Sequence, residues 1–238
     1  MQEKRVIGIV QPTYLPWMPF FERMAISDRF VLLDDVEYSK NSFHNRNALK
    51  SPNGRIMLTV PVLYKGYSKV FINEIYVDNT KPWQRKHWNT IRQCYAKAPY
   101  FDTYKDELES MYMAPKEKLI NVIIPLIDFL KRELGIATPC RLSSEIGVTG
   151  NRNEKLVGLC KHFQGTHFVV KPNTHDYHPA EEFEPHGIRF HYLEYSKVEY
   201  PQLHGKFEPY LSALDFVMNC GPGVFASYYG KRAIGPRS

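Results

Sequence analysis

The chain has 238 residues, of which 43% are hydrophobic and 24% are charged, a balance that is typical of a globular protein. The four cysteines, Cys94, Cys140, Cys160 and Cys220, are widely spaced and form no CxxC pair, which indicates reduced thiols and excludes a disulfide framework. No apolar run reaches the length of a membrane span, and the charged N-terminus leads into a short strand instead of a signal-peptide core. We therefore expect a soluble, cytoplasmic protein.

The formal net charge of +6 is unevenly distributed along the chain. Residues 1–100 contain 15 Lys and Arg against 8 Asp and Glu, whereas residues 101–238 contain 16 against 17. A basic cleft in the first part would attract phosphates, nucleotide-linked sugars or RNA. A solvated, lysine-rich surface explains the same excess equally well, so charge alone leaves both interpretations open.

Two short apolar runs at residues 6–10 and 30–33 flank an amphipathic segment at 18–25. This order predicts a βαβ unit with parallel strands. In open parallel sheets, ligands bind beyond the carboxyl ends of the strands. Polar side chains follow both runs, so we expect the functional site there.

The turn after the first predicted strand contains Pro12, Pro16 and Pro19, which make it stiff. Tyr14 and Trp17 on this loop are candidates for a stacking wall, although Trp17 also suits the space between helix and sheet. Gln11 lies at the strand end, where we expect a buried amide with a ligand as its partner. Pro19 fits the first turn of the helix.

Asp34 and Asp35 end the second predicted strand. Neighbouring side chains on a strand point to opposite faces, so the two carboxylates do not form an acid/base dyad. One is suited to Mg²⁺ or a sugar hydroxyl, and the other to capping the next turn.

A dense polar cluster follows at residues 38–47. We expect it to be too polar and irregular to belong to the core. His44 is a candidate general base because its ordinary pKa lies near neutrality. Arg46, between Asn45 and Asn47, resembles a clamp for an anion or sugar hydroxyls, and Lys40 precedes it.

Further along the chain, Asn53-Gly54 predicts a hairpin turn before a strand at 55–62, and residues 71–77 alternate as another strand. Helices are predicted at 81–95, 104–112 and 116–134, with Gly135 as a stop. Lys86 and His87 are adjacent on the first of these helices, so we expect one of them to reach the site.

A second βαβ-like unit comprises a strand at 140–144, a helix start at 149–151, a helix body at 156–163 and a strand at 166–170. Six of the nine histidines fall between His162 and His191, but their spacing matches no metal site, so we expect no metal there. Ser212 and Asp215 form a capping-box pattern before an apolar stretch. One domain is expected over 1–228, with a helical insertion at about 81–134 and a flexible tail at 229–238.

Several motifs resemble the WbqC-like protein family over nearly the whole chain. They are residues 11–17 (QPTYLPW), 33–40 (LDDVEYSK), 45–47 (NRN), 58–61 (LTVP), Trp83 with Lys86-His87, and 200–202 (YPQ). The first unit also looks like a nucleotidylyltransferase-type, Rossmann-like α/β fold, but Leu15 to Met18 replace the His-x-Gly-His turn of those proteins. We therefore expect an α/β protein with a parallel-sheet core and an added helical segment.

The resemblance implies a transferase that attaches an acyl or aminoacyl group, such as glycyl, to an amino sugar in O-antigen biosynthesis. Activation by ATP with Mg²⁺ and supply by an aminoacyl-tRNA both remain open, and the acceptor is a nucleotide-linked or lipid-linked amino sugar. His44, His87 and Asp35 are the candidate catalytic residues. The candidate substrate-binding residues are Gln11, Tyr14, Trp17, Asp34, Lys40, Asn45, Arg46, Asn47, Lys86 and Gln202. The alternatives are a non-catalytic sugar- or nucleotide-binding module and an RNA-binding protein.

Overall fold

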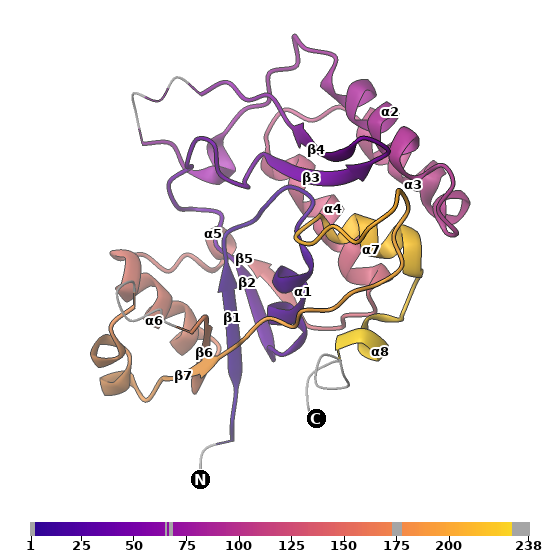
Figure 1. The fold of residues 1–238 in the computed structure, drawn as a ribbon. Coiled ribbons are helices and arrows are strands. Elements are labelled where there is room, and N and C mark those ends of the chain that lie inside the picture. Colours follow the sequence, from indigo (N-terminus) through magenta and orange to yellow (C-terminus); the bar gives the residue numbers. More distant parts are fainter. Residues whose placement is uncertain (1–2, 65, 67–68, 173–177, 230–238) are drawn as a thin grey trace.

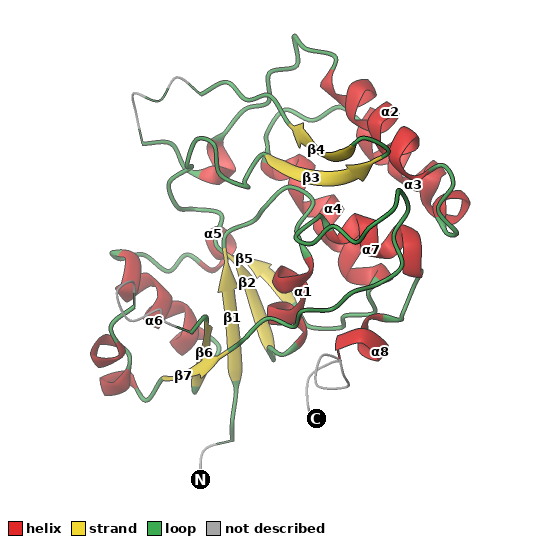
Figure 2. Cartoon of the chain, in the orientation of Figure 1, coloured by secondary structure: helices red, strands yellow, loops and turns green. Residues whose placement is uncertain are grey.

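The computed structural model describes residues 3–64, 66, 69–172 and 178–229. Five parallel strands form one sheet in the order β5-β2-β1-β6-β7, with β1 at its centre (Figure 1). The strands are β1 Val6–Val10, β2 Arg29–Leu32, β5 Cys140–Leu142, β6 His167–Val170 and β7 Arg189–Tyr192. Helices flank this sheet (Figure 2), so the predicted α/β, Rossmann-like core is confirmed.

The predicted first βαβ unit is present, with helix α1 (Met18–Ala25) joining β1 to β2. Trp17 precedes α1 with an extended backbone, and Pro19 occupies the first turn, where its missing N–H is not needed. Gly8 in β1 has no space for a side chain, because an added Cβ would lie 2.5 Å from Ser27 Oγ and 2.6 Å from the Phe30 ring. Gly8 therefore allows Ser27, just after α1, and the Phe30 ring of β2 to approach β1 closely.

The helical segment contains α2 (Trp83–Tyr95), α3 (Phe101–Met113) and α4 (Ile120–Glu133), within the predicted range of 81–134. Gly135 follows α4 with a φ of 70°, a backbone conformation that favours glycine, so the predicted stop is confirmed.

An antiparallel hairpin of β3 (Arg46–Ser51) and β4 (Gly54–Thr59) lies beside α2. The turn at Asn53-Gly54 was predicted, but β3 was not. The expectation that residues 38–47 are too polar for the core was also wrong, because His44, Asn45 and Asn47 are buried. Polar side chains can be buried when each finds a hydrogen-bond partner, as these do.

Two other predicted strands differ from the structure. Within residues 71–77 only η1 (Ile72–Glu74) is regular, as a 3₁₀-helix in which the Glu74 carboxylate accepts from Phe71 N–H at 3.1 Å. The predicted strand at 140–144 ends at Leu142, because helix α5 (Ser143–Ile146) begins directly after it. At η1 a local side-chain hydrogen bond stabilises the helical turn. At α5 the Ser144 N–H instead donates to the carboxylate of Asp34, which is distant in sequence.

The predicted second βαβ-like unit is confirmed, since α6 (Arg152–His162) joins β5 and α5 to β6. Asn151 and Glu154 form the capping box that begins α6. Two 3₁₀-helices, η2 (Ala180–Glu182) and η3 (Glu184–His186), then lead to β7.

The last two helices are α7 (Ala213–Cys220) and α8 (Phe225–Tyr229). Ser212 caps α7 as predicted, but the buried Asp215 carboxylate accepts from the Tyr95 hydroxyl at 2.9 Å instead of completing a capping box. The predicted flexible tail lies outside the described residues except for Tyr229, which belongs to α8.

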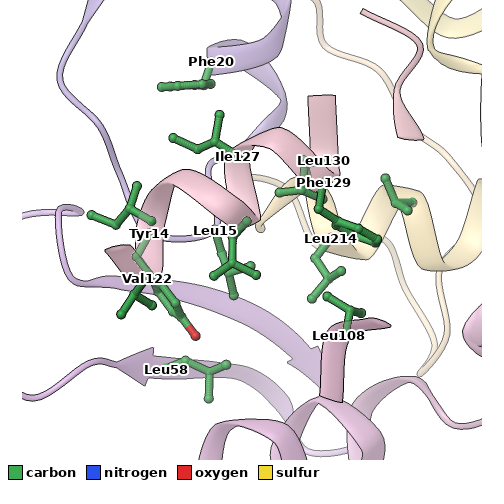
Figure 3. Close-up of a cluster of buried hydrophobic side chains, with 14 of the residues drawn as sticks. Tyr14, Leu15, Phe20, Leu58, Leu108, Val122, Ile127, Phe129, Leu130 and Leu214 are labelled. Carbon is green, nitrogen blue, oxygen red and sulfur yellow. The ribbon is translucent and has the colours of Figure 1, made fainter. Parts of the chain in front are cut away.

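The buried apolar side chains form two clusters on either side of the sheet. The larger joins α1, the hairpin, α2 to α4 and α7, and Figure 3 shows residues such as Leu58, Leu108 and Leu214 converging in it. The smaller includes Ile7, Val31 and residues of α6. No helix in the described part of the chain is long and apolar enough to cross a membrane.

Candidate functional site at the carboxyl edge of the sheet

The order of the strands defines where a ligand can approach the sheet. From β1 the chain runs outward through β2 to β5, and it then returns to the other side of β1 as β6. The direction of winding therefore changes between β1 and β6, and such switch points are the usual binding crevices of open parallel sheets. Gln11 follows β1 and Lys171 follows β6 at this edge.

Gln11 and His44 form a hydrogen-bonded pair directly beyond β1. His44 Nε2 lies 3.0 Å from Gln11 Oε1, and the Ser39 backbone N–H donates to His44 Nδ1 at 3.4 Å. Since an N–H can only donate, Nδ1 is the acceptor and Nε2 carries the proton. Burial lowers the pKa of His44 from 6.5 to about 4, so its imidazole is neutral at physiological pH. Gln11 is exposed, contrary to the expected buried amide.

A cavity of about 140 Å³ lies near His44, from which Tyr38 separates it, and three of the predicted residues line it, Lys40, Asn45 and Arg46. The ring of Tyr38 lies 5.5 Å from that of His44 and also lines the cavity. The Arg46 guanidinium donates to the Asn41 carbonyl, but its buried Nε has no partner among the residues that the structure describes. Two cations and an unpaired donor make this cavity suited to a small anionic group.

Asp34 and Asp35, directly after β2, contact residues of α5 and α6 at the sheet edge. The buried Asp34 carboxylate accepts from Ser144 N–H and from the hydroxyls of Ser143 and Ser144, so it caps α5. Asp35 pairs with Lys155 Nζ at 2.7 Å and shares the single proton of the Ser143 hydroxyl with Asp34. Both carboxylates are already engaged by protein groups, and this cluster does not fit the Mg²⁺ ion that ATP would bring. No group of three or more metal-ligating side chains occurs among the described residues.

His87 and Tyr14 lie in the core, joined in a chain of hydrogen bonds. His87 Nε2 donates to the Thr59 carbonyl at 3.2 Å, and its Nδ1 accepts from Tyr14 OH at 2.9 Å. Tyr112 OH in turn donates to Tyr14 OH at 2.5 Å. Burial lowers the pKa of His87 to about 4. Both nitrogens of each imidazole are engaged, but the Ser39 hydrogen bond to His44 is long, at 3.4 Å, and His44 contacts the exposed Gln11 at the sheet edge. His44 is therefore better placed than His87 to meet a substrate.

The other predicted residues lie apart from the Gln11–His44 pair. Asn47 is buried and donates to the Leu15 carbonyl at 2.7 Å, which fixes the loop after β1. Lys86 is exposed on α2. Gln202 accepts from the buried Lys50 ammonium at 3.1 Å and orders the segment before α7. These contacts give Asn47 and Gln202 an evident structural role.

Trp17 lines a second, larger cavity beside α1, together with residues that the sequence analysis did not select. They include Lys171, Tyr195, Tyr200 and Tyr210. The high aromatic content of 14% was the sequence signal for such a site, but it did not indicate which rings converge.

The fold and this edge define an α/β protein with a Rossmann-like sheet and a polar site beyond the central strand. The profile of the WbqC-like protein family matches residues 11–225, and the chain belongs to this family. It is 31% identical over 217 residues to "Uncharacterized protein Rv1507c" of Mycobacterium tuberculosis, covering 90% of this chain and 94% of that relative. No solved structure matches the chain.

Proposed function

We propose that the chain is a transferase that joins an activated acyl or aminoacyl group, such as glycyl, to the amine of an amino sugar in bacterial surface-polysaccharide biosynthesis. The observation that carries this proposal is the neutral His44 imidazole, held by Gln11 beside the cavity of Lys40 and Arg46. Membership of the WbqC-like family supports the sugar as acceptor.

The chemistry needs a proton acceptor and a positive field at one place. The sugar amine attacks the acyl carbonyl, the new C–N bond forms, and the C–O bond to the leaving group breaks. His44 Nδ1 takes the amine proton after the long Ser39 hydrogen bond is replaced. Lys40 and Arg46 stabilise the negative charge that develops on the carbonyl oxygen and leaving group. The leaving group is AMP if ATP activates the acyl group, or the tRNA ribose if an aminoacyl-tRNA supplies it.

The proposal is tested by incubating the protein with nucleotide-linked amino sugars and either glycine with ATP or glycyl-tRNA, and analysing products by mass spectrometry. We expect an acceptor heavier by one glycyl residue. We also expect His44→Ala to reduce turnover about 10²-fold or more. Full turnover in both His44→Ala and His87→Ala would show that the base is another group.

A second candidate function is a non-catalytic module that binds a sugar or nucleotide within a biosynthetic assembly. The low pKa of His44 favours it, because an imidazole with a pKa of about 4 is a weak proton acceptor. This alternative predicts ligand binding without any product from either acyl donor, and it predicts that His44→Ala changes affinity only.

A further inference from the structure

The larger cavity has a volume of about 750 Å³ and lies between the start of α1 and the segment that follows β7. This segment leaves β7 and passes α1 on its way to α7 (Figure 1). The volume lies within the range of about 300 to 1,000 Å³ that is usual for small-molecule sites. Lys171, directly after β6, places one end of the cavity beside the switch point of the sheet.

Two cations converge on one tyrosine of this cavity. Arg23 donates from its guanidinium to Tyr195 OH at 2.9 Å, and Lys171 Nζ lies 5.4 Å from the centre of the same ring. The nearby Glu22 carboxylate is occupied by the Ser196 backbone N–H, 3.2 Å from each oxygen. Neither Arg23 nor Lys171 forms an ion pair with any described residue. Two neighbouring cations that form no ion pair within the described part of the chain repel each other, and a bound anion would offset that repulsion.

The same cavity has a rigid aromatic wall. The Trp17 ring lies 5.8 Å from those of both Tyr195 and Tyr210. Tyr210 is 62% exposed and has a φ of 59°, a region that residues other than glycine adopt rarely. Its carbonyl accepts from Arg55 at 3.3 Å, which helps to hold this conformation. A large exposed ring carried on a strained backbone at the edge of a cavity is typical of a ligand contact.

We propose that this cavity binds a nucleoside diphosphate group, with the base stacked on the exposed Tyr210 ring beside Trp17 and the phosphates at Lys171 and at the Tyr195 hydroxyl that Arg23 holds. The aromatic wall distinguishes this ligand from a simple inorganic anion, and the unpaired cations distinguish it from a neutral glycan. If the proposed function holds, the group is the nucleotide carrier of the acceptor sugar. The binding itself does not depend on acyl transfer.

The test is isothermal titration calorimetry of the full chain with UDP, GDP and ADP, and with inorganic pyrophosphate and maltotriose for comparison. We expect at least one nucleotide to bind about tenfold or more tightly than pyrophosphate, because stacking adds to the charge interaction. Lys171→Gln removes a charged contact and should weaken nucleotide binding about tenfold. Tyr210→Ala should weaken nucleotide binding while leaving pyrophosphate binding unchanged.

Matched controls are Lys97→Gln and Tyr76→Ala, which alter an exposed cation and an exposed tyrosine away from the cavity. Both should bind nucleotide as the unmodified chain does. The inference would be overturned by equal affinity for nucleotide and pyrophosphate, or by a preference for maltotriose. It would also be overturned if no nucleotide bound, or if both cavity variants bound nucleotide with unchanged affinity. Nucleotide binding without glycyl transfer would instead contradict the proposed function and leave this inference standing.

Discussion

The two buried histidines should make the stability of this protein depend on pH in a defined way. Burial lowers the pKa of both His44 and His87 from 6.5 to about 4, and both side chains are only 3% exposed. The perturbation is a change from pH 7.5 to pH 5. Over this range the two imidazoles become protonated in the unfolded chain but stay neutral in the folded chain. Because the unfolded state then binds more protons, stability falls as the pH falls from about 6.5 towards 4.

The magnitude follows from the two pKa values. At pH 5, a histidine with a pKa of 6.5 when unfolded and about 4 when folded lowers the free energy of unfolding by about 2 kcal/mol. The two residues together should therefore lower it by about 4 kcal/mol, a large part of the total stability of a typical domain. Below pH 4 the folded imidazoles also become protonated, and the loss levels off.

The assay is urea denaturation at both pH values, followed by the fluorescence of the buried Trp83 and Trp88. Other groups titrate in the same range, so the quantity of interest is the difference between variants. In His87→Gln, the loss of stability between pH 7.5 and pH 5 should be about 2 kcal/mol smaller than in the unmodified chain. His186→Gln, at an exposed position, is the matched control and should retain the full loss. An equal loss in His87→Gln and the unmodified chain would refute the reasoning that His87 is neutral because it is buried.

Three further predictions concern residues at and near the sheet edge. Lys155→Met leaves the Asp35 carboxylate without its cation and should lower the free energy of unfolding by about 2 to 3 kcal/mol in urea titrations. This loss is smaller than for a fully buried pair because Asp35 is partly exposed. An unchanged midpoint would show that water replaces the ammonium. Gly8→Ala places a methyl group 2.6 Å from the Phe30 ring and should destabilise the chain by about 1 to 3 kcal/mol in thermal melts. A melting temperature equal to that of the unmodified chain would contradict this close approach. Lys86→Gln, on the exposed face of α2, should change stability by less than about 0.5 kcal/mol, so any loss of turnover in this variant would be functional; a clear loss of stability would indicate a structural role instead.

The elements that could be predicted are those that neighbouring residues specify. The predicted features include the apolar runs of β1 and β2, the Asn53-Gly54 turn, the helix start at 149–151 and the Gly135 stop. Each of them depends on residues close in sequence. The hairpin strand β3 was missed because its polar residues are buried only through partners elsewhere in the chain. Asn47, for example, is held by the Leu15 carbonyl.

The candidate site also has a part that local sequence patterns predict and a part that they do not. The sequence correctly indicated that polar side chains follow the ends of β1 and β2, and the structure brings Gln11 and His44 together there. It could not indicate that Tyr14 and His87 share a buried hydrogen-bond chain, nor that the Asp35 carboxylate pairs with Lys155. These partners are separated by 73 and 120 positions, and local patterns carry no information on contacts at that distance.

The sequence by itself determined the fold class, the family and the residue types available at the sheet edge, because periodicity, turns and motifs depend on residues that are close in sequence. Only the tertiary structure decided which of those polar groups are already satisfied by the protein and which remain open to a ligand. Asp34, Asp35 and His87 belong to the first group, whereas Arg46 and the aromatic cavity around Trp17 belong to the second. The physical reason is that the desolvation cost of a polar group depends on all of its neighbours in space, and the chain assembles those neighbours only when it folds.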